Sequence, residues 1–513
     1  MSLELPTPPR LAITQAAALP RTIDAFDHLT VLLPASAQRG AWPAFPHSKL
    51  LAGRYRARHA GQPDARLRTE LENGHGTRVA VAFVKPEAST FELLTLGRML
   101  LGEARESRPK RLGLLVLGLP DALAARAAEA YAAATLAAEH PLPEYRSALA
   151  PRVAIESLAI HAKSDGAGTG FDLARTRAAS VGNGLARWLA TLPPNELTPG
   201  AYRALVAKLA KRYGWKMRFH DEAALAKRGA NAFLAVVRGS AERDAGIVEL
   251  ERIPPRRAKA KGAKRAAAPL ALVGKGICFD TGGSNLKSPK GMYGMHGDMG
   301  GSAVALGTLV ALSELDAPQP ARCYLALAQN RIGPRSYLPN EVIRASNGVT
   351  IEVVHTDAEG RMVLADTLAL AGEAQPSGII DFATLTGSCV HALTDRMSGA
   401  FTNRPALDTT VIEAGRSSGE RVWPFPMDAD YDEALESKVA DVKQCLIEGQ
   451  GDHILAARFL SRFVPAGVPW VHVDLAAGDR EGGLGHVASL FTGFGVRFAL
   501  DLILDRRFGA EAP

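Results

Sequence analysis

Short apolar runs alternate with helix-forming stretches along this chain, and no other feature constrains its fold as strongly. In the first part, three apolar runs have the length and composition of buried strands, and an alanine-rich stretch at 121–140 predicts a helix with Asp121 as its N-cap. The predicted strands are 29–35, 78–84 and 111–119. Because strands that alternate with helices are typical of layered α/β folds, we predict that class here.

The second part repeats the alternation. Strands are predicted at 270–273, 323–329, 350–356 and 378–385, and helices at 173–191, 302–315 and 362–374. A chain of 513 residues is too long for one ordinary domain. We therefore predict a smaller N-terminal α/β domain at 1–165, a linker helix within 166–192 and a larger C-terminal α/β domain at 193–513. In the larger domain we expect a mixed, mostly parallel central sheet flanked by helices.

The positive charge of the chain is concentrated in one segment. The net charge is +7, and residues 252–265 (RIPPRRAKAKGAKR) hold seven basic residues and no acidic one, so the remainder is neutral. Such a segment is typical of a solvated, mobile loop, which we place at 252–268. The alternative is a functional anion-binding patch.

The cysteine content and the N-terminus indicate a cytoplasmic protein. The four cysteines are scattered without a CxxC pair, as expected for free thiols in a reducing compartment; they are Cys278, Cys323, Cys389 and Cys445. No apolar run reaches the roughly 18 residues that span a bilayer. The N-terminus lacks the basic start and the apolar core of a signal peptide. We expect no membrane partner.

Three predicted strands run directly into polar clusters. LALV leads into GKGICFD, TIEVV into HTDAEGR and IIDFA into TLTG. In open α/β sheets, ligand sites collect outside the carboxyl ends of the strands. The three clusters are therefore expected to form one site.

Asp357 and Glu359 are the first candidates for metal ligands. They flank Ala358, so in an extended backbone their carboxylates point to the same side and repel each other unless a cation lies between them. A pair of divalent ions about 3.5–4 Å apart needs bridging carboxylates, and Asp280 and Asp298 are the best additional ligands. Taken alone, DAEGR could equally form a surface turn.

Other chemistries lack their motifs. The sequence contains no HExxH, no GxSxG, no P-loop and no GxGxxG after a strand. The histidines lack metal-ligand spacing, so we expect them to be structural.

Four segments closely resemble the leucyl aminopeptidase (cytosol aminopeptidase) family, whose signature is NTDAEGRL. They are VGKGICFDTGGSNLK (273–287), GMYGMHGDMGGSA (291–303), HTDAEGRMVLAD (355–366) and DFATLTGS (381–388). PPNELTP (193–199) is similar to the inter-domain region of the family. The resemblance is strong over 190–400, moderate to 513 and weak before 165. It implies a dinuclear metallo-aminopeptidase that releases N-terminal amino acids from short peptides.

The resemblance implies a role for each matching position. The implied metal ligands are Lys275 through its neutral amine, Asp280, Asp298, Asp357 and Glu359. They would hold two divalent ions per subunit, zinc or manganese, with magnesium or cobalt as further candidates.

The two implied catalytic groups are Lys287 and Arg361. Lys287 would polarise the scissile carbonyl, and Arg361 would hold a bicarbonate that acts as general base. The pocket for the N-terminal side chain would be lined by Met295, Thr384 and Gly387.

The resemblance also implies an assembly and leaves alternatives. The family forms a homohexamer, a dimer of trimers, and some members bind DNA, for which the basic segment would supply phosphate contacts. An inactive family relative is the other alternative. The chain departs from the family at His355, where asparagine is usual, at 448–463 and at 472–497. Because these departures lie near the expected pocket and a subunit contact, the resemblance does not by itself imply a leucine preference.

Overall fold

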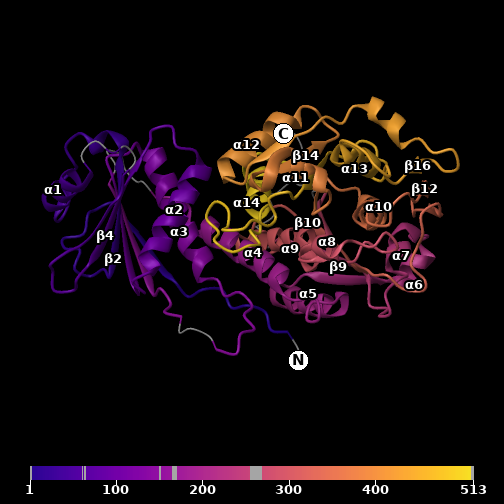
Figure 1. Ribbon diagram of the computed structural model, residues 1–513, viewed down its shortest axis with the longest axis horizontal. Helices are drawn as coiled ribbons and strands as arrows, with labels where there is room; N and C mark the ends of the chain where they lie inside the picture. The colour runs from indigo at the N-terminus through magenta and orange to yellow at the C-terminus, as the bar shows by residue number, and fades with distance from the viewer. Residues whose placement is uncertain are drawn as a thin grey trace, which may run out of the picture. The chain divides into compact units, whose positions relative to one another are not determined.

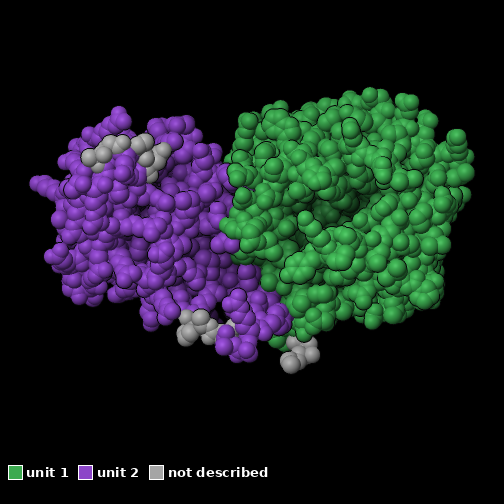
Figure 2. Space-filling view, viewed as in Figure 1, with its two compact units in different colours: residues 1–6, 181–483, 489–513 green, residues 7–180, 484–488 purple. Residues whose placement is uncertain are grey.

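The computed structural model describes residues 3–59, 62, 65–148, 152–163, 170–254 and 268–509. The chain forms two compact units (Figure 2). The smaller comprises residues 7–180 and 484–488, and the larger comprises residues 1–6, 181–483 and 489–513. Helix α4 (Leu173–Thr191) runs through the division after Ser180, so the segment predicted as a linker contributes to both units.

The smaller unit is built on a six-stranded sheet (Figure 1). Its order is β1-β6-β5-β2-β4-β3, and all neighbours are parallel except β3 and β4. The strands are β1 (Ala12–Ala16), β2 (His28–Pro34), β3 (Leu67–Glu70), β4 (Arg78–Val84), β5 (Arg111–Leu117) and β6 (Ser157–Lys163). The helices are α1 (Ser48–His59), α2 (Thr90–Arg105), α3 (Asp121–Glu139) and the short η1 (Ala35–Gln38). Apolar clusters cover both faces of the sheet, which explains the continuous apolar runs of β2, β4 and β5.

The start of α3 differs from the prediction by one residue. Pro120 occupies the N-cap position, and Asp121 is the first residue of the helix. No side chain makes a capping hydrogen bond at this end. The prediction that Asp121 is the N-cap was therefore wrong. Its carboxylate instead lies in the first turn, where it interacts favourably with the helix dipole.

The larger unit contains an eight-stranded sheet of order β15-β14-β17-β13-β9-β10-β8-β7. The central strands β17, β13, β9 and β10 are parallel, whereas β14 with β17, β10 with β8 and β8 with β7 are antiparallel. The strands are β7 (Lys216–Asp221), β8 (Gly246–Arg252), β9 (Leu270–Asp280), β10 (Ala321–Asn330), β13 (Gly378–Ala383), β14 (Ser398–Thr402), β15 (Val422–Pro424) and β17 (Trp470–Asp474). The predicted α/β class with a mixed sheet is confirmed.

Helices cover this sheet. They are α5 (Pro199–Tyr213), α6 (Glu222–Lys227), α7 (Asn231–Val237), α8 (Pro289–Met292), α9 (Gly300–Glu314), α10 (Glu359–Glu373), α11 (Gly387–Leu393), α12 (Leu407–Ser418), α13 (Asp452–Ser461) and α14 (Val496–Leu500), with the short turns η2 (Met295–Gly297), η3 (Thr394–Arg396), η4 (Ala429–Leu435) and η5 (Asp501–Asp505). No helix in the described part of the chain combines the length and the apolar character that crossing a membrane requires.

Successive residues of β9 face opposite sides of the sheet and therefore contact different helices. A Cβ on Gly274 would lie 2.4 Å from the Cα of Ser302 in α9, so only glycine allows this close approach. The next side chain, Lys275, points the other way, because its Nζ lies 2.7 Å from the position of a Cβ on Gly360 in α10. The lysine is thereby directed to the beginning of α10.

Two sequence predictions in this unit were wrong in detail. The run at 350–356 forms only the short strand β12 (Thr350–Glu352), which pairs with β11 (Val342–Arg344) and β16 (Val442–Lys443) in a separate three-stranded sheet.

The basic loop was predicted to begin at Arg252, but this residue ends β8 and is buried. Its guanidinium donates to the carbonyl oxygens of Leu312, Ala317 and Gln319. Residues 255–267 of the predicted loop lie outside the described residues.

Candidate metal centre and substrate pocket

The five predicted metal ligands come from three segments of the larger unit. Lys275 and Asp280 lie within β9, so this strand does not end before the polar cluster as predicted but carries it. Asp298 follows η2 directly, and Met299 separates it from the beginning of α9. Glu359 is the first residue of α10, and Asp357 lies in the turn that precedes it.

Two lysines join the four carboxylates. Lys275 Nζ lies 2.8 Å from Asp298 Oδ1 and 2.9 Å from Glu359 Oε1. Lys287 Nζ lies 2.9 Å from Asp280 Oδ2 and 2.6 Å from Asp357 Oδ1. When all four carboxylates are ionised, they carry more negative charge than the two ammonium groups balance. This excess, in a largely buried cluster, favours the binding of cations.

Carboxylate oxygens of Asp280, Asp357 and Glu359 converge to within 4.8 Å of one another. The extended backbone that we invoked for Asp357 and Glu359 is absent, since Ala358 has φ −105° and ψ 37° and caps α10. A turn followed by the start of a helix, not a strand, brings the two carboxylates together.

Burial and mutual repulsion make the acids of the cluster reluctant to ionise. Burial is the main cause of the raised pKa of Asp298 and Glu359, and the neighbouring carboxylates add to it while Lys275 opposes it. The pKa of Asp357 is raised by burial and by Asp280. Burial disfavours the charge on Lys275, but Asp298, Glu359 and Asp280 outweigh it and raise the pKa of this ammonium. Protons are therefore held tightly where cations would bind.

Unpaired carboxylate oxygens show that this donor set fits a hard divalent cation. Asp298 Oδ2 and Glu359 Oε2 are buried and accept no hydrogen bond from any described residue. A buried acceptor without a partner costs on the order of 1–3 kcal/mol, and more when it is charged. Coordination of a metal by these oxygens removes that cost, and oxygen-rich sites suit such ions.

Neighbouring polar groups orient the carboxylates. Asp280 Oδ1 accepts hydrogen bonds from Asn330 Nδ2 at 2.8 Å and from the backbone N–H of Gly282 at 2.9 Å. The hydroxyl of Thr384 donates to Asp298 Oδ1 at 2.7 Å. Such partners fix ligand geometry in metal sites.

Comparison with known proteins decides the family. Residues 184–500 match the catalytic domain of the cytosol aminopeptidase family. The chain is 36% identical over 448 residues to a probable cytosol aminopeptidase of Parasynechococcus marenigrum, which covers 85% of this chain and 88% of that protein. The chain belongs to the cytosol aminopeptidase family. It is accordingly a metal-dependent peptidase, as the resemblance implied.

Solved structures agree over nearly the whole chain. A mutant tomato leucine aminopeptidase superposes with a TM-score of 0.83 at 26% identity and covers 98% of this chain and 99% of that chain. The bottromycin maturation enzyme BotP in complex with Mn superposes with a TM-score of 0.76 at 29% identity and covers 94% and 99%. Members of the family thus share this architecture.

Arg361 lies in the first turn of α10, two residues after Glu359, and its side chain is only 2% exposed. Nη1 donates to the carbonyl oxygen of Gln444 at 3.1 Å, and Nη2 donates to Asp452 Oδ2 at 2.7 Å. Gln444 also accepts from the backbone N–H of His355 and donates to the carbonyl of Ala358. His355 Nδ1 lies 3.3 Å from the amide nitrogen of Asp357. The histidine that replaces the asparagine usual in the family therefore contacts the turn that contains the predicted metal ligand Asp357.

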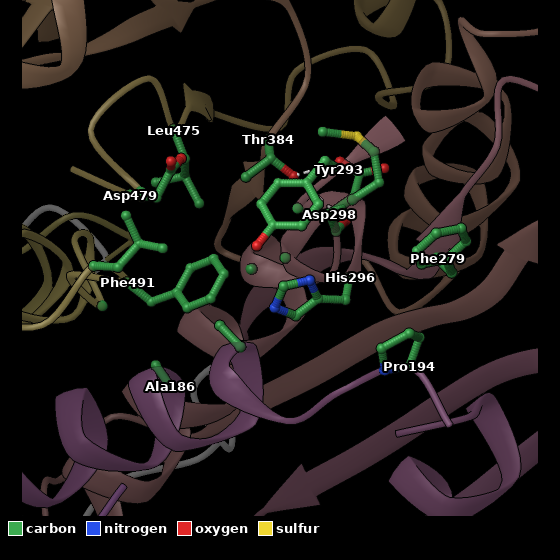
Figure 3. A pocket seen from close by; sticks show the side chains of 18 of the residues that line it. Ala186, Pro194, Phe279, Tyr293, His296, Asp298, Thr384, Leu475, Asp479 and Phe491 are labelled. Carbon is green, nitrogen blue, oxygen red and sulfur yellow. Dashed lines mark hydrogen bonds between the residues drawn. The ribbon is translucent and has the colours of Figure 1, made fainter. Parts of the chain in front are cut away.

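A cavity of 620 Å³ opens beside Asp298 (Figure 3). Most of its lining is apolar or aromatic, including Met292, Tyr293, Leu475, Leu490, Phe491 and Phe494. The rings of His296 and Phe491 meet edge to face at 5.4 Å. Of the predicted pocket residues, Met295 and Thr384 line the cavity, and Gly387, the first residue of α11, is not part of the lining.

Sequence reasoning missed three residues that shape the site. Asn330 could have been found, because it is a polar residue at the end of a predicted strand. Gln444 and Asp452 follow no recognisable motif, and they meet Arg361 from 83 and 91 residues away. The histidines were predicted to be structural. His472 is buried and pairs with Asp381 at 2.6 Å, whereas His296 lines the cavity.

Metal binding is expected to release protons. Because the pKa values of Lys275, Asp298 and Glu359 are all raised, cations and protons compete, and metal affinity must fall as the pH falls. We expect calorimetric titration with Mn²⁺ near pH 7, in buffers of different ionisation enthalpy, to show release of at least one proton. Affinity should then change about tenfold per pH unit for each proton released. Lys275→Met should release one proton fewer. An affinity that does not depend on pH would contradict this description.

Proposed function

We propose that this protein removes N-terminal amino acids from short peptides with two divalent metal ions, held by Lys275, Asp280, Asp298, Asp357 and Glu359. The observation that supports the proposal best is the convergence of four carboxylates and two lysines in one buried cluster beside an apolar cavity. A pair of such ions lowers the pKa of bound water and polarises the scissile carbonyl.

The side chains of the protein would divide the remaining tasks. Asp280 is held by Asn330 and Gly282, and Asp298 by Thr384, so the ligands are oriented before an ion binds. Lys287 is 16% exposed and pairs with Asp280 and Asp357, so its ammonium would lie beside a substrate carbonyl bound at the metals. Its ammonium would stabilise the negative charge that develops on the carbonyl oxygen in the transition state.

Zinc and manganese are the ions we expect, with magnesium or cobalt as alternatives. Carboxylate and amine ligands discriminate weakly among them, so availability decides. Manganese is favoured by the Mn complex of BotP, which shares this fold.

A direct assay tests the proposed function. Purified protein supplied in turn with Mn²⁺, Zn²⁺, Mg²⁺ or Co²⁺ should cleave leucyl-anilide and release single residues from the N-terminus of a peptide with at least one of these ions. A chelator should abolish the reaction. The same substrates with acetylated N-termini should resist cleavage, because the site would trim only free ends. Absence of turnover with every one of the four ions would favour the alternative of an inactive family relative.

The apolar lining of the cavity predicts a preference for large apolar N-terminal side chains. Phe491→Ala should lower kcat/KM for a leucyl substrate by about tenfold or more, since a lost apolar contact in a binding pocket is worth roughly 1–3 kcal/mol. An alanyl substrate, which does not reach the ring, serves as the internal control. An unchanged ratio of leucyl to alanyl cleavage would show that the cavity does not receive this side chain.

Three further predictions concern the whole protein. We propose a cytoplasmic location and a homohexamer, both by analogy with the family. DNA binding through the basic segment is a second role that deletion of residues 255–265 would test by gel shift, with peptidase activity as the control.

A further inference from the structure

The carboxylate of Asp452 lies on the guanidinium where the family resemblance placed a bicarbonate. Asp452 Oδ2 is 2.7 Å from Arg361 Nη2, and the carbonyl oxygen of Gln444 occupies Nη1. Only Nε of this buried guanidinium lacks a partner among the described residues. An external anion on this guanidinium would compete with the carboxylate that already binds Nη2 and would meet the negative charges of Asp452 and Glu359. The residues around Arg361 therefore do not fit a bicarbonate.

Asp452 reaches Arg361 because of the way α13 begins. Gly451 has φ +71°, a left-handed conformation that favours glycine, and it places Asp452 as the first residue of the helix. The dipole of α13 stabilises a negative charge at this position. The backbone N–H of His453 donates to Ser388 Oγ, which ties the start of α13 to α11.

The two oxygens of Asp452 have different environments. Oδ2 is held by Arg361, whereas Oδ1 accepts no hydrogen bond from any described residue, and the side chain is 35% exposed. Arg361 connects Asp452 to the site, because Gln444 binds both the guanidinium and the backbone N–H of His355. His355 Nδ1 in turn accepts from the backbone N–H of Asp357. One anchored oxygen and one accessible oxygen are what a proton acceptor at this site requires.

The electrostatic setting keeps Asp452 ionised. Burial opposes its charge, but Arg361 outweighs burial through its charge and its hydrogen bond, and the pKa of Asp452 is lowered. The carboxylate is therefore available as a base at neutral pH.

We infer that Asp452 is the general base of the reaction and replaces an external bicarbonate, an inference that rests on the proposed peptidase function. The attacking water forms a C–O bond to the scissile carbonyl carbon, the π electrons move to the carbonyl oxygen, and the water proton passes to Asp452 Oδ1. When the C–N bond breaks, its electron pair stays on the nitrogen, which takes up that proton. Asp452 returns to its ionised form.

The test compares wild type with Asp452→Asn and Asp452→Gly in buffer freed of carbon dioxide, with and without added bicarbonate. Wild type should be fully active without bicarbonate and gain nothing from it. Asp452→Asn should lose about 10²-fold to 10⁴-fold in kcat with little change in KM, the usual contribution of a general base. Asp452→Gly should lose as much, but added bicarbonate should restore its activity in a saturable manner, because the glycine variant leaves room for an anion on Arg361.

Asp432→Asn is the matched control. Asp432 of η4 pairs with Arg458 of α13 at 2.9 Å and makes no hydrogen bond or ion pair with Arg361 in the described part of the chain. The variant therefore removes an ion pair of α13 and should keep wild-type kcat. Carbon-13-labelled bicarbonate provides a readout without turnover: it should bind Asp452→Gly and not wild type. Stimulation of wild type by bicarbonate, or full activity of Asp452→Asn, would overturn the inference. Absence of wild-type activity with every metal would instead refute the proposed function.

Discussion

Glu359→Gln should yield a folded protein that has lost its peptidase activity by on the order of 10³-fold or more. Glu359 is 1% exposed and pairs with Lys275, and its Oε2 has no hydrogen-bond partner among the described residues. It is therefore a buried carboxylate with one oxygen available to bind a metal ion. Metal ions contribute several kcal/mol of transition-state stabilisation, and about 1.4 kcal/mol corresponds to a factor of ten in rate. Steady-state kinetics with leucyl-anilide measures the loss.

The stability of the same variant separates a lost ligand from a damaged fold. Because the pKa of Glu359 is raised, its ionised form costs stability at neutral pH, and glutamine resembles the protonated form. Without metal, Glu359→Gln should therefore unfold at the same temperature as wild type or higher. Wild type should gain roughly 2.7 kcal/mol from metal at a hundredfold excess over Kd, and the variant should gain much less.

Glu373→Gln at the other end of α10 is the control, since Glu373 forms an exposed ion pair with Arg228. It should match wild type in both assays. Wild-type turnover by Glu359→Gln would remove this residue from the proposed site.

Lys287→Met should lower kcat by about 10²-fold to 10³-fold, the usual effect of removing one group that stabilises an oxyanion. Its Nζ lies 2.9 Å from Asp280 and 2.6 Å from Asp357, so the ammonium also competes with cations for these carboxylates. We therefore expect the variant to bind divalent metal as tightly as wild type or more tightly. This combination of retained metal and lost turnover distinguishes an electrophile from a ligand.

Lys290→Met provides the comparison, because Lys290 is an exposed lysine of α8 three residues away. It should change neither kcat nor metal affinity. Loss of metal from Lys287→Met, measured by calorimetry, would contradict the role assigned to Lys287.

The sequence predicted the parts of the fold that depend on local pattern. The apolar runs at 78–84 and 111–119 form β4 and β5, and the helix predicted at 173–191 is α4. The two strands are almost uniformly apolar, which indicates burial on both faces of a sheet, and the helix is long enough to show a clear pattern. The run at 350–356 was misjudged because only three of its residues find a strand partner, and those partners come from outside the main sheet.

The site was predictable in its residues and less so in its geometry. Lys275, Asp280, Asp298, Asp357 and Glu359 were named from motifs, and the structure brings their side chains together. The reason given for Asp357 and Glu359 was wrong, since a helix start replaces the extended backbone.

The contact between Asp452 and Arg361 could not be predicted. It joins residues that are 91 positions apart and depends on a left-handed glycine at the start of α13. Local patterns carry no information on such a pairing, so only the folded chain reveals it.

Diffraction from crystals grown with Mn²⁺, recorded at the manganese absorption edge, would show whether the five side chains bind two metal ions. We predict two anomalous peaks in each chain, about 3.5–4 Å apart, both next to the oxygens of Asp280 and Glu359. One peak should contact Lys275 Nζ and Asp298, and the other should contact Asp357. Crystals that bind manganese elsewhere, or that show no peak among these side chains at saturating metal, would contradict this prediction.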